Sequence, residues 1–188
     1  MEGRLLFLCA MVLCISITAM SVHCEYHKEN PHHGHMKEKK THLHFYLHDI
    51  LSGKKPSAIM VAHTKTLIGI NFATPFGTVY AIDDPLTEGP EPTSKVIGNA
   101  QGLYVSSAQD ILSLVMYVDF AFTTGKYNGS SLSVFSRNPV MEGDREIAVV
   151  GGRGKFRMAR GFAELKTTYF NTTNGDAIIE YKVTILHY

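Results

Sequence analysis

A cluster of glycine and arginine residues at positions 145–161 is the stretch whose residue types most directly suggest chemistry. The backbone N–H groups of a glycine turn can bind a phosphate, but only where the turn leads from a strand into a helix. Here an apolar, β-branched run at 147–150 precedes the glycines, and an extended pattern follows them. We therefore predict a β-hairpin with solvated arginines, not a phosphate-binding loop. The expected turn residues are Gly151, Gly152 and Gly154, and the second strand is expected to resume with Phe156, Met158 and Gly161.

Three histidines near the N-terminus, His32, His33 and His35, have side chains that suit copper or zinc. They lie in the segment 22–40, which is rich in charge and nearly free of large aliphatic residues, a composition typical of disorder. A functional metal site needs ordered groups around its ligands, and such a segment offers none. We therefore expect a solvated tail and no metal site.

Residues 1–21 have the pattern of a secretory signal peptide, with Arg4, an apolar run at 5–15 and small residues near Ala19. The apolar run is shorter than the roughly 20 residues that cross a bilayer, so we expect cleavage between about 19 and 24, and no stable membrane insertion. Secretion is the predicted outcome. All three cysteines, Cys9, Cys14 and Cys24, lie in or beside this segment, so the mature chain cannot form an internal disulfide.

Two Asn-x-Ser/Thr acceptors, at Asn128 and Asn171, lie in turn-like contexts and fit a secreted glycoprotein. The formal net charge is only +1, and no broad basic surface is indicated. Nucleic acid is therefore not an expected partner.

From Thr41 onward, apolar and polar residues alternate with a period of two, and turn signals leave no room for crossover helices. The pattern predicts a single all-β domain at 41–188, an antiparallel barrel or sandwich. A short helical turn near Ser107 stays open as an alternative, and Asp83 and Asp84 before Pro85 are interpreted chiefly as turn formers. Strands are expected at 42–48, 57–63, 77–82, 100–106, 113–123, 131–136, 146–150, 161–170 and 177–186.

Four motifs, at 45–50, 76–87, 98–104 and 145–161, follow one another in the order seen in plant dirigent proteins. The chain resembles this family from about Thr41 to its C-terminus. The resemblance implies an eight-stranded antiparallel β-barrel of the dirigent and allene oxide cyclase type, usually a homotrimer secreted to the extracellular space of the plant, the apoplast. The usual cysteine pair of the family is missing, so we expect stability to come from barrel closure, packing and subunit contacts.

The resemblance implies a protein that gives stereoselectivity to the coupling of monolignol phenoxy radicals in lignan or lignin biosynthesis. A separate laccase or peroxidase supplies the radicals, so no cofactor is expected and the protein itself need not be an enzyme. An alternative is a hydro-lyase similar to pterocarpan synthases, which dehydrates an isoflavanol through a quinone methide. A structural cell-wall protein without a phenolic ligand is a third possibility, because fold alone does not determine function.

The resemblance also assigns residues to the pocket that would hold the phenolic ligand. Asp49 would be the acid toward a quinone methide or a leaving hydroxyl, Tyr104 would bind a phenol or relay a proton, and Arg145 would bind a phenolate oxygen. Each has a purely structural alternative: Asp49 as a turn former, Tyr104 as a core residue, and Arg145 in a surface ion pair with Asp144 or Glu142.

Three further positions are expected to contact the substrate: Asn138, Asp83 and Phe45, with Asp83 a weaker candidate than Asp49. Asn138 departs from lignan-forming relatives, in which an aspartate at this place would be a second acid. Because an asparagine cannot donate a proton as a carboxylic acid does, the resemblance leaves Asp49 as the principal acid and Asn138 as a neutral hydrogen-bonding group.

Overall fold

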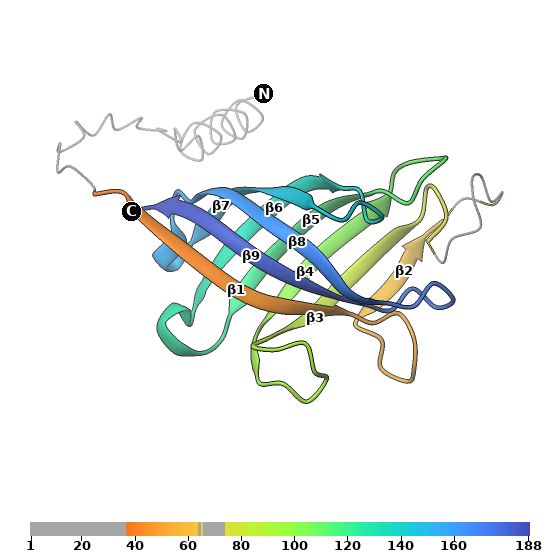
Figure 1. The fold of residues 1–188 in the computed structure, drawn as a ribbon, viewed down its shortest axis with the longest axis horizontal. Coiled ribbons are helices and arrows are strands. Elements are labelled where there is room, and N and C mark those ends of the chain that lie inside the picture. Colours follow the sequence, from red (N-terminus) through yellow and green to blue (C-terminus); the bar gives the residue numbers. More distant parts are fainter. Residues whose placement is uncertain (1–36, 64, 66–73) are drawn as a thin grey trace, which may run out of the picture. The chain divides into compact units, whose positions relative to one another are not determined.

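The computed structural model describes residues 37–63, 65 and 74–188, which form an antiparallel β-barrel (Figure 1). The predicted signal peptide, the three cysteines and the histidines at 32, 33 and 35 lie outside the described residues. No helix in the described part is long and apolar enough to cross a membrane. The elements are β1 (Lys39–Asp49), β2 (Ala58–Ala62), β3 (Val79–Thr87), β4 (Val96–Ser106), β5 (Leu114–Phe122), the 3₁₀ turn η1 (Gly125–Tyr127), β6 (Ser130–Asn138), β7 (Arg145–Arg153), the 3₁₀ turn η2 (Gly154–Phe156), β8 (Arg160–Phe170) and β9 (Ala177–His187).

Eight of these strands close into a ring. The strand order is β1-β9-β8-β7-β6-β5-β4-β3-β2, and β1 also pairs with β3 through Tyr46↔Thr87 and Leu47↔Leu86. Strand β2 pairs only with β3 and lies outside the closed ring. Closure pairs the backbone groups that an open sheet would leave exposed at its edges. The predicted all-β, eight-stranded antiparallel barrel is therefore confirmed.

Large aromatic side chains fill the middle of the barrel. Phe45 from β1 stacks on Tyr181 from β9 with ring centroids 5.5 Å apart, and both rings meet the edge of Phe120 from β5. The interior of an eight-stranded barrel is just wide enough for side chains to fill, so an aromatic layer of this kind closes it. A cavity at an end of the barrel would therefore have this aromatic layer as its floor.

The Asp83-Asp84-Pro85 stretch is part of strand β3, and the predicted turn at this place is wrong. Residues 79–82 of β3 pair with β2, whereas 86–87 pair with β1, so the strand exchanges one neighbour for another along its length. Pro85 lacks an N–H and lies in the gap between these two partner segments, where the lost donor costs least. The strand alternation therefore continues through both aspartates, and they point to opposite sides of the barrel wall.

The β7–β8 hairpin is present, but its turn lies further along the chain than predicted. Gly151 and Gly152 belong to β7 and pair with Ser133 and Leu132 of β6. The turn is η2, which begins at Gly154 with φ +65°, and β8 begins only at Arg160. A second strand, and not a helix, follows the turn. The predicted hairpin is therefore confirmed, and the alternative of a phosphate-binding loop is excluded.

Several strands begin or end a few residues from their predicted bounds; β4, for example, begins at Val96 and not at residue 100. Strand β1 begins at Lys39, two residues before the expected domain start at Thr41, because Lys39 and Lys40 continue the pairing with β9. No helical turn forms near Ser107, and β5 begins at Leu114.

Candidate functional site

A cavity of about 360 Å³ occupies one end of the barrel. Strands β1, β6 and β8 end there at Asp49, Asn138 and Phe170, while β7 and β9 begin there at Arg145 and Ala177. Most of its wall is apolar, contributed by residues that include Leu47, Ile82, Met116 and Ile179. An apolar hollow with few polar groups is the usual form of a small-molecule site.

Asp49 and Tyr104 meet inside this cavity. The Tyr104 hydroxyl donates a hydrogen bond to the Asp49 carboxyl, and Oδ1 of Asp49 is buried with no hydrogen-bond partner among the described residues. Burial raises the pKa of Asp49 to about 7; the bond from Tyr104 opposes this rise and the nearby Asp176 carboxylate adds to it. Asp49 can therefore hold a proton at mildly acidic pH, as a general acid must.

Asp84 from β3 brings a second carboxyl group to the same end of the cavity. It is 1% exposed, and neither of its oxygens has a hydrogen-bond partner among the described residues. The neighbouring Ser57 hydroxyl favours the charged form, but it donates to the carbonyl oxygen of His48 at 3.1 Å. Burial first, and then the proximity of Asp49, raise the pKa of Asp84 well above its usual range. Two carboxyls this close hold on to protons that isolated carboxyls would lose near pH 4.

Arg145 approaches the cavity from the start of β7 and is 4% exposed. Its Nη1 donates to the carbonyl oxygens of Val140 (2.6 Å) and Glu142 (3.4 Å), and its Nη2 donates to Thr167 Oγ1 (2.9 Å). Its Nε is buried with no partner among the described residues. Burial lowers the pKa of Arg145, while Tyr181 and Glu142 oppose the change. No ion pair recorded among the described residues includes Arg145, so the alternative of a surface ion pair is wrong.

Asn138 lies at the end of β6 and is 5% exposed. Its Nδ2 donates to Met116 Sδ at 3.2 Å, and its Oδ1 has no partner in the described part of the chain. A buried amide oxygen without a donor is costly unless a ligand supplies one. Together, Asn138 Oδ1 and Arg145 Nε offer one acceptor and one donor to a polar group in the cavity.

Two of the expected contact residues do not line the cavity. Asp83 is exposed on the outer side of β3, where it accepts a hydrogen bond from Asn99 Nδ2 at 2.6 Å. Phe45 is 1% exposed and lies in the aromatic layer below. The structure therefore places Asp84, not Asp83, at the site. Phe45 lies beneath Tyr181 and does not line the cavity.

Asp84 and Tyr181 were missed from the sequence, although the strand alternation contained a signal for Asp84. The inward positions of β3 are Tyr80, Ile82, Asp84 and Leu86, so the alternation would have identified Asp84 had the strand been continued past Ile82. The Tyr181 hydroxyl lies within electrostatic reach of both Arg145 and the two carboxyls. Burial and the carboxyls raise the pKa of Tyr181, and Arg145 lowers it.

The two glycosylation acceptors lie in turns, as expected. Asn128 is exposed after η1. Asn171 is half-buried beside Phe170 and Thr172, which line the cavity, and its Oδ1 accepts a hydrogen bond from Thr173 N at 2.9 Å. Glycosylation of either residue stays a prediction.

Comparisons with known proteins agree on one family. A family model described as "Dirigent-like protein" matches residues 40–186. The chain is 51% identical over 180 residues to Dirigent protein 15 of Arabidopsis thaliana, covering 94% of this chain and 95% of that protein. It is 49% identical over 156 residues to Pterocarpan synthase 1 of Glycyrrhiza echinata, covering 82% of each. A solved structure of the pterocarpan synthase dirigent protein GePTS1 matches with 50% identity and a TM-score of 0.76, covering 81% of this chain and 87% of that one.

Proposed function

Because the chain belongs to the dirigent-like protein family, we propose that its cavity binds a phenolic small molecule and dehydrates it, as a hydro-lyase similar to pterocarpan synthases. The observation that carries this proposal is the pair of buried carboxyls, Asp49 and Asp84, beside the Tyr104 hydroxyl. Loss of water from an isoflavanol requires a proton donor, which a buried neutral carboxyl supplies.

Proton transfer from Asp49 would start the reaction. The neutral carboxyl donates its proton to the leaving hydroxyl of an isoflavanol, the C–O bond breaks, and one molecule of water departs. The electron pair of a ring phenol moves in to give a quinone methide as that phenol loses its proton to water, from which the oxygen takes a proton back after ring closure. Arg145 Nε would donate to the substrate oxygen on which negative charge develops, and Asn138 Oδ1 would accept a hydrogen bond from a substrate hydroxyl.

Ring closure would restore the acid. A second phenol oxygen of the substrate attacks the electrophilic carbon of the quinone methide, and its proton passes to the Asp49 carboxylate. The quinone methide oxygen regains a proton, so the net change is the loss of one water. Burial of Asp49 favours its return to the neutral form, and burial together with the Asp49 charge also keeps Asp84 protonated.

A second candidate function is stereoselective coupling of monolignol radicals supplied by a laccase or peroxidase. Supporting it are the mostly apolar cavity wall and the 51% identity to a relative named Dirigent protein 15. A protein of this class would hold the radicals without oxidising them and would show no turnover in the absence of the oxidase.

The two functions are distinguished by incubating the mature protein with an isoflavanol in the absence of any oxidant, and separately with coniferyl alcohol plus laccase. Chiral chromatography then measures the products of both reactions. Faster loss of water in the first reaction supports the lyase. An enantiomeric excess in the second reaction alone would establish the coupling function and overturn the lyase. Failure of both reactions would contradict a phenolic site.

Adjacent aspartates provide a matched pair of variants for the same assay. We expect Asp84→Asn to slow dehydration on the order of 100-fold, because it removes a cavity carboxyl. Asp83→Asn changes the same side chain one residue earlier on the outer wall, and we expect it to leave the rate nearly unchanged. Equal effects of the two substitutions would exclude a specific role for Asp84.

We also propose a homotrimer, supported by a row of apolar side chains on the outer wall. Leu103, Tyr117 and Phe135 occupy matching positions on β4, β5 and β6 and are 40%, 61% and 55% exposed. The rings of Tyr117 and Phe135 lie 6.2 Å apart. Contiguous exposed apolar residues of this kind are typical of protein–protein contacts.

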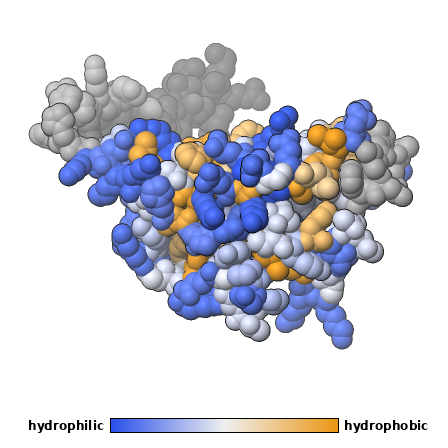
Figure 2. Space-filling model, viewed as in Figure 1, coloured by the Kyte–Doolittle hydropathy of each residue, from blue (hydrophilic) through white to orange (hydrophobic). Residues whose placement is uncertain are grey.

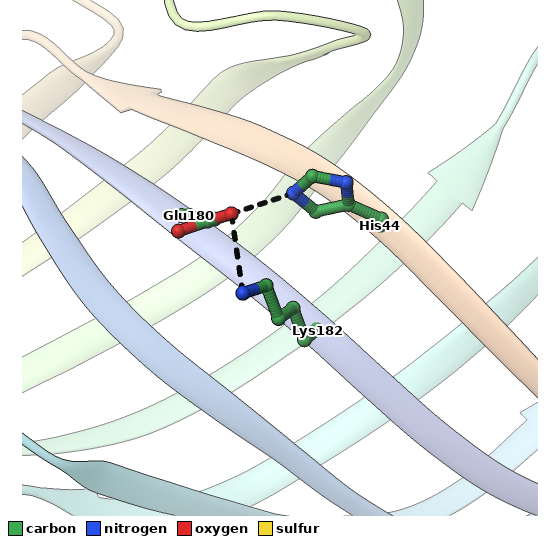
Figure 3. Close-up of polar contacts among 3 residues, drawn as sticks. All are labelled: His44, Glu180 and Lys182. Atoms are coloured by element: carbon green, nitrogen blue, oxygen red, sulfur yellow. Dashed lines mark hydrogen bonds and ion pairs between the residues drawn. The ribbon is translucent and has the colours of Figure 1, made fainter.

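The face formed by β1, β9 and β8 has a different character. Hydrophilic residues cover most of it, with hydrophobic residues showing between them (Figure 2). His44 Nε2 donates to Glu180 Oε1 at 2.7 Å, and Lys182 Nζ lies 3.7 Å from the same oxygen (Figure 3). Ion pairs on a solvated face contribute little to stability. This contrast favours the wall of β4 to β6 as the subunit contact.

Secretion to the apoplast is a further part of this proposal, supported by the signal-peptide pattern at 1–21 and the acceptors at Asn128 and Asn171. N-terminal sequencing of protein exported from plant cells should find cleavage between about residues 19 and 24. Digestion with an N-glycosidase should lower its mass. An uncleaved chain retained in the cell would contradict secretion.

A further inference from the structure

Asp176 lies outside the reactive end of the cavity, at the end of the β8–β9 loop. The β1–β9 ladder ends with the pair Asp49↔Ala177, so Asp176 is the first residue beyond it, next to the chain that leaves Asp49. Neither its sequence context nor the family resemblance singles out this aspartate. Its contacts do.

The Asp176 carboxylate is the centre of a hydrogen-bond cluster that joins two loops. Its Oδ1 accepts from the backbone N–H groups of Leu51 (2.8 Å) and Ser52 (3.0 Å). Its Oδ2 accepts from Ser52 Oγ (2.5 Å) and Asn174 Nδ2 (2.9 Å). Desolvation would raise the pKa of Asp176, but these hydrogen bonds outweigh it and lower the pKa, so the group is ionised at neutral pH.

These bonds restrain the segment that directly follows Asp49. On one side Ile50 N donates to Ser57 Oγ at 3.0 Å, and Ser57 N donates back to Ile50 O at 2.8 Å. On the other side Asp176 holds Leu51 and Ser52. The last residue of β1 is thus held from both sides at the point where its side chain enters the cavity.

We propose that Asp176 is a positioning residue for the site: its carboxylate holds residues 51–52 so that the Asp49 carboxyl faces Tyr104. Its negative charge also disfavours ionisation of Asp49. The other titratable groups that face Asp49 are Tyr104 from β4, which favours its charged form, and Asp84, Tyr80 and Tyr181 from β3 and β9, whose own pKa values the Asp49 charge raises. Asp176 is the one that approaches from the loop before β9. The inference rests on the proposed acid role of Asp49.

Two substitutions separate the charge of Asp176 from its hydrogen bonds. Asp176→Asn keeps an oxygen for the Leu51 and Ser52 N–H groups but removes the charge and the acceptor for Asn174 Nδ2. We expect the apparent pKa of Asp49 to fall by roughly 0.5–1 unit, with the pH profile of kcat moving by the same amount. Asp176→Ala removes both, and we expect kcat to fall on the order of tenfold or more while KM changes little.

The titration of Asp49 is measured by carboxyl ¹³C NMR, with Asp49→Asn used to assign the signal, and kcat is measured by isoflavanol dehydration. Asp119→Asn is the matched control, because Asp119 lines no part of the cavity and also accepts bonds from two side chains, Ser131 and Ser133. An unshifted Asp49 titration in Asp176→Asn together with a wild-type kcat in Asp176→Ala would overturn the inference. If the wild-type protein does not dehydrate isoflavanols, the proposed function fails, and the NMR titrations of Asp49 in Asp176→Asn and Asp176→Ala still show whether Asp176 acts on Asp49 through its charge and its hydrogen bonds.

Discussion

Asp49 and Asp84 lie in one buried end of the cavity without enough hydrogen-bond donors to stabilise two charges. A structural role would favour donors around each oxygen, since an unsatisfied buried carboxylate costs stability. Unsatisfied polar atoms recur across the cavity at Asn138 Oδ1 and Arg145 Nε. Several unsatisfied polar atoms in one cavity are typical of a binding site in which the ligand supplies the missing hydrogen-bond partners.

Replacing Asp49 with Asn should stabilise the protein while removing its activity. The pKa of Asp49 rises from 3.8 to about 7 on folding, so its ionisation above pH 4 opposes folding. The wild-type protein therefore loses folding stability as the pH rises from about 4 to about 7, whereas Asp49→Asn does not. Urea unfolding should show the variant more stable by on the order of 2–4 kcal/mol at pH 8 and by little at pH 3. A difference independent of pH would contradict the raised pKa.

Asn138→Asp tests whether a further acid in the cavity changes the chemistry. The family resemblance implies an aspartate at this position in lignan-forming proteins, so we expect the substitution to increase the enantiomeric excess of laccase-driven coniferyl alcohol coupling. Asn138→Ser, which is neutral, is the control. The same product distribution in Asn138→Asp, Asn138→Ser and the wild-type protein would show that this position does not select between the two functions.

At the scale of elements, the two ends of the barrel differ, because one holds the cavity and the other is closed by a turn. The ends of β1 and β6 and the start of β7 bring the Asp49 carboxyl, the Asn138 amide and the Arg145 guanidinium to the cavity. The η2 turn, at the opposite end of β7, packs Phe156 beneath the wall against Phe122 and Tyr127. The turn therefore closes one end of the barrel and leaves the other to bind ligand.

Two neighbouring glycines in β7 should differ sharply in their tolerance of alanine. A Cβ on Gly152 would lie 2.6 Å from Phe156 O and 2.8 Å from Ser131 O, whereas one on Gly151 would meet no atom within 4 Å. We expect Gly152→Ala to lower the free energy of unfolding by about 1–3 kcal/mol and Gly151→Ala to change it little. Thermal and urea unfolding measure both. Equal tolerance would show that η2 does not pack as closely as described.

At the scale of the whole molecule, the outer wall of the barrel indicates where subunits would contact one another. The outer wall of β4 to β6 exposes a row of apolar side chains, whereas hydrophilic residues cover most of the face of β1, β9 and β8 (Figure 2). Without a disulfide in the described barrel, burial of the apolar row between subunits would add stability by removing it from water.

The proposed trimer predicts a specific sensitivity to charge. Tyr117→Asp with Phe135→Asp should convert the trimer to monomers, because each subunit would bury an unpaired carboxylate in the contact. Lys182→Asp alters the charged face and should leave the assembly intact. Light scattering coupled to size-exclusion chromatography measures the mass of each. A wild-type monomer, or a trimer that survives the double substitution, would contradict the proposed contact.

Local sequence patterns were enough to predict most of the strands, the antiparallel class and the family of this protein. The alternation of residues and the turn signals predicted nearly every strand and the antiparallel class, because both depend on neighbours within a few residues. The motifs around Asp49, Tyr104 and Arg145 indicated the family and nominated three residues that now line one cavity. All of these signals can be detected in short windows of the chain.

Only the tertiary structure decided which aspartate of the Asp83-Asp84 pair enters the cavity, and what Asp176 holds. The orientation of Asp84 depends on β3 continuing past Ile82 as it exchanges β2 for β1, which is a pairing between distant segments. The raised pKa of Asp49 and of Asp84 arises from burial by residues on other strands. Register and desolvation are properties of barrel closure, so no short window of sequence contains them.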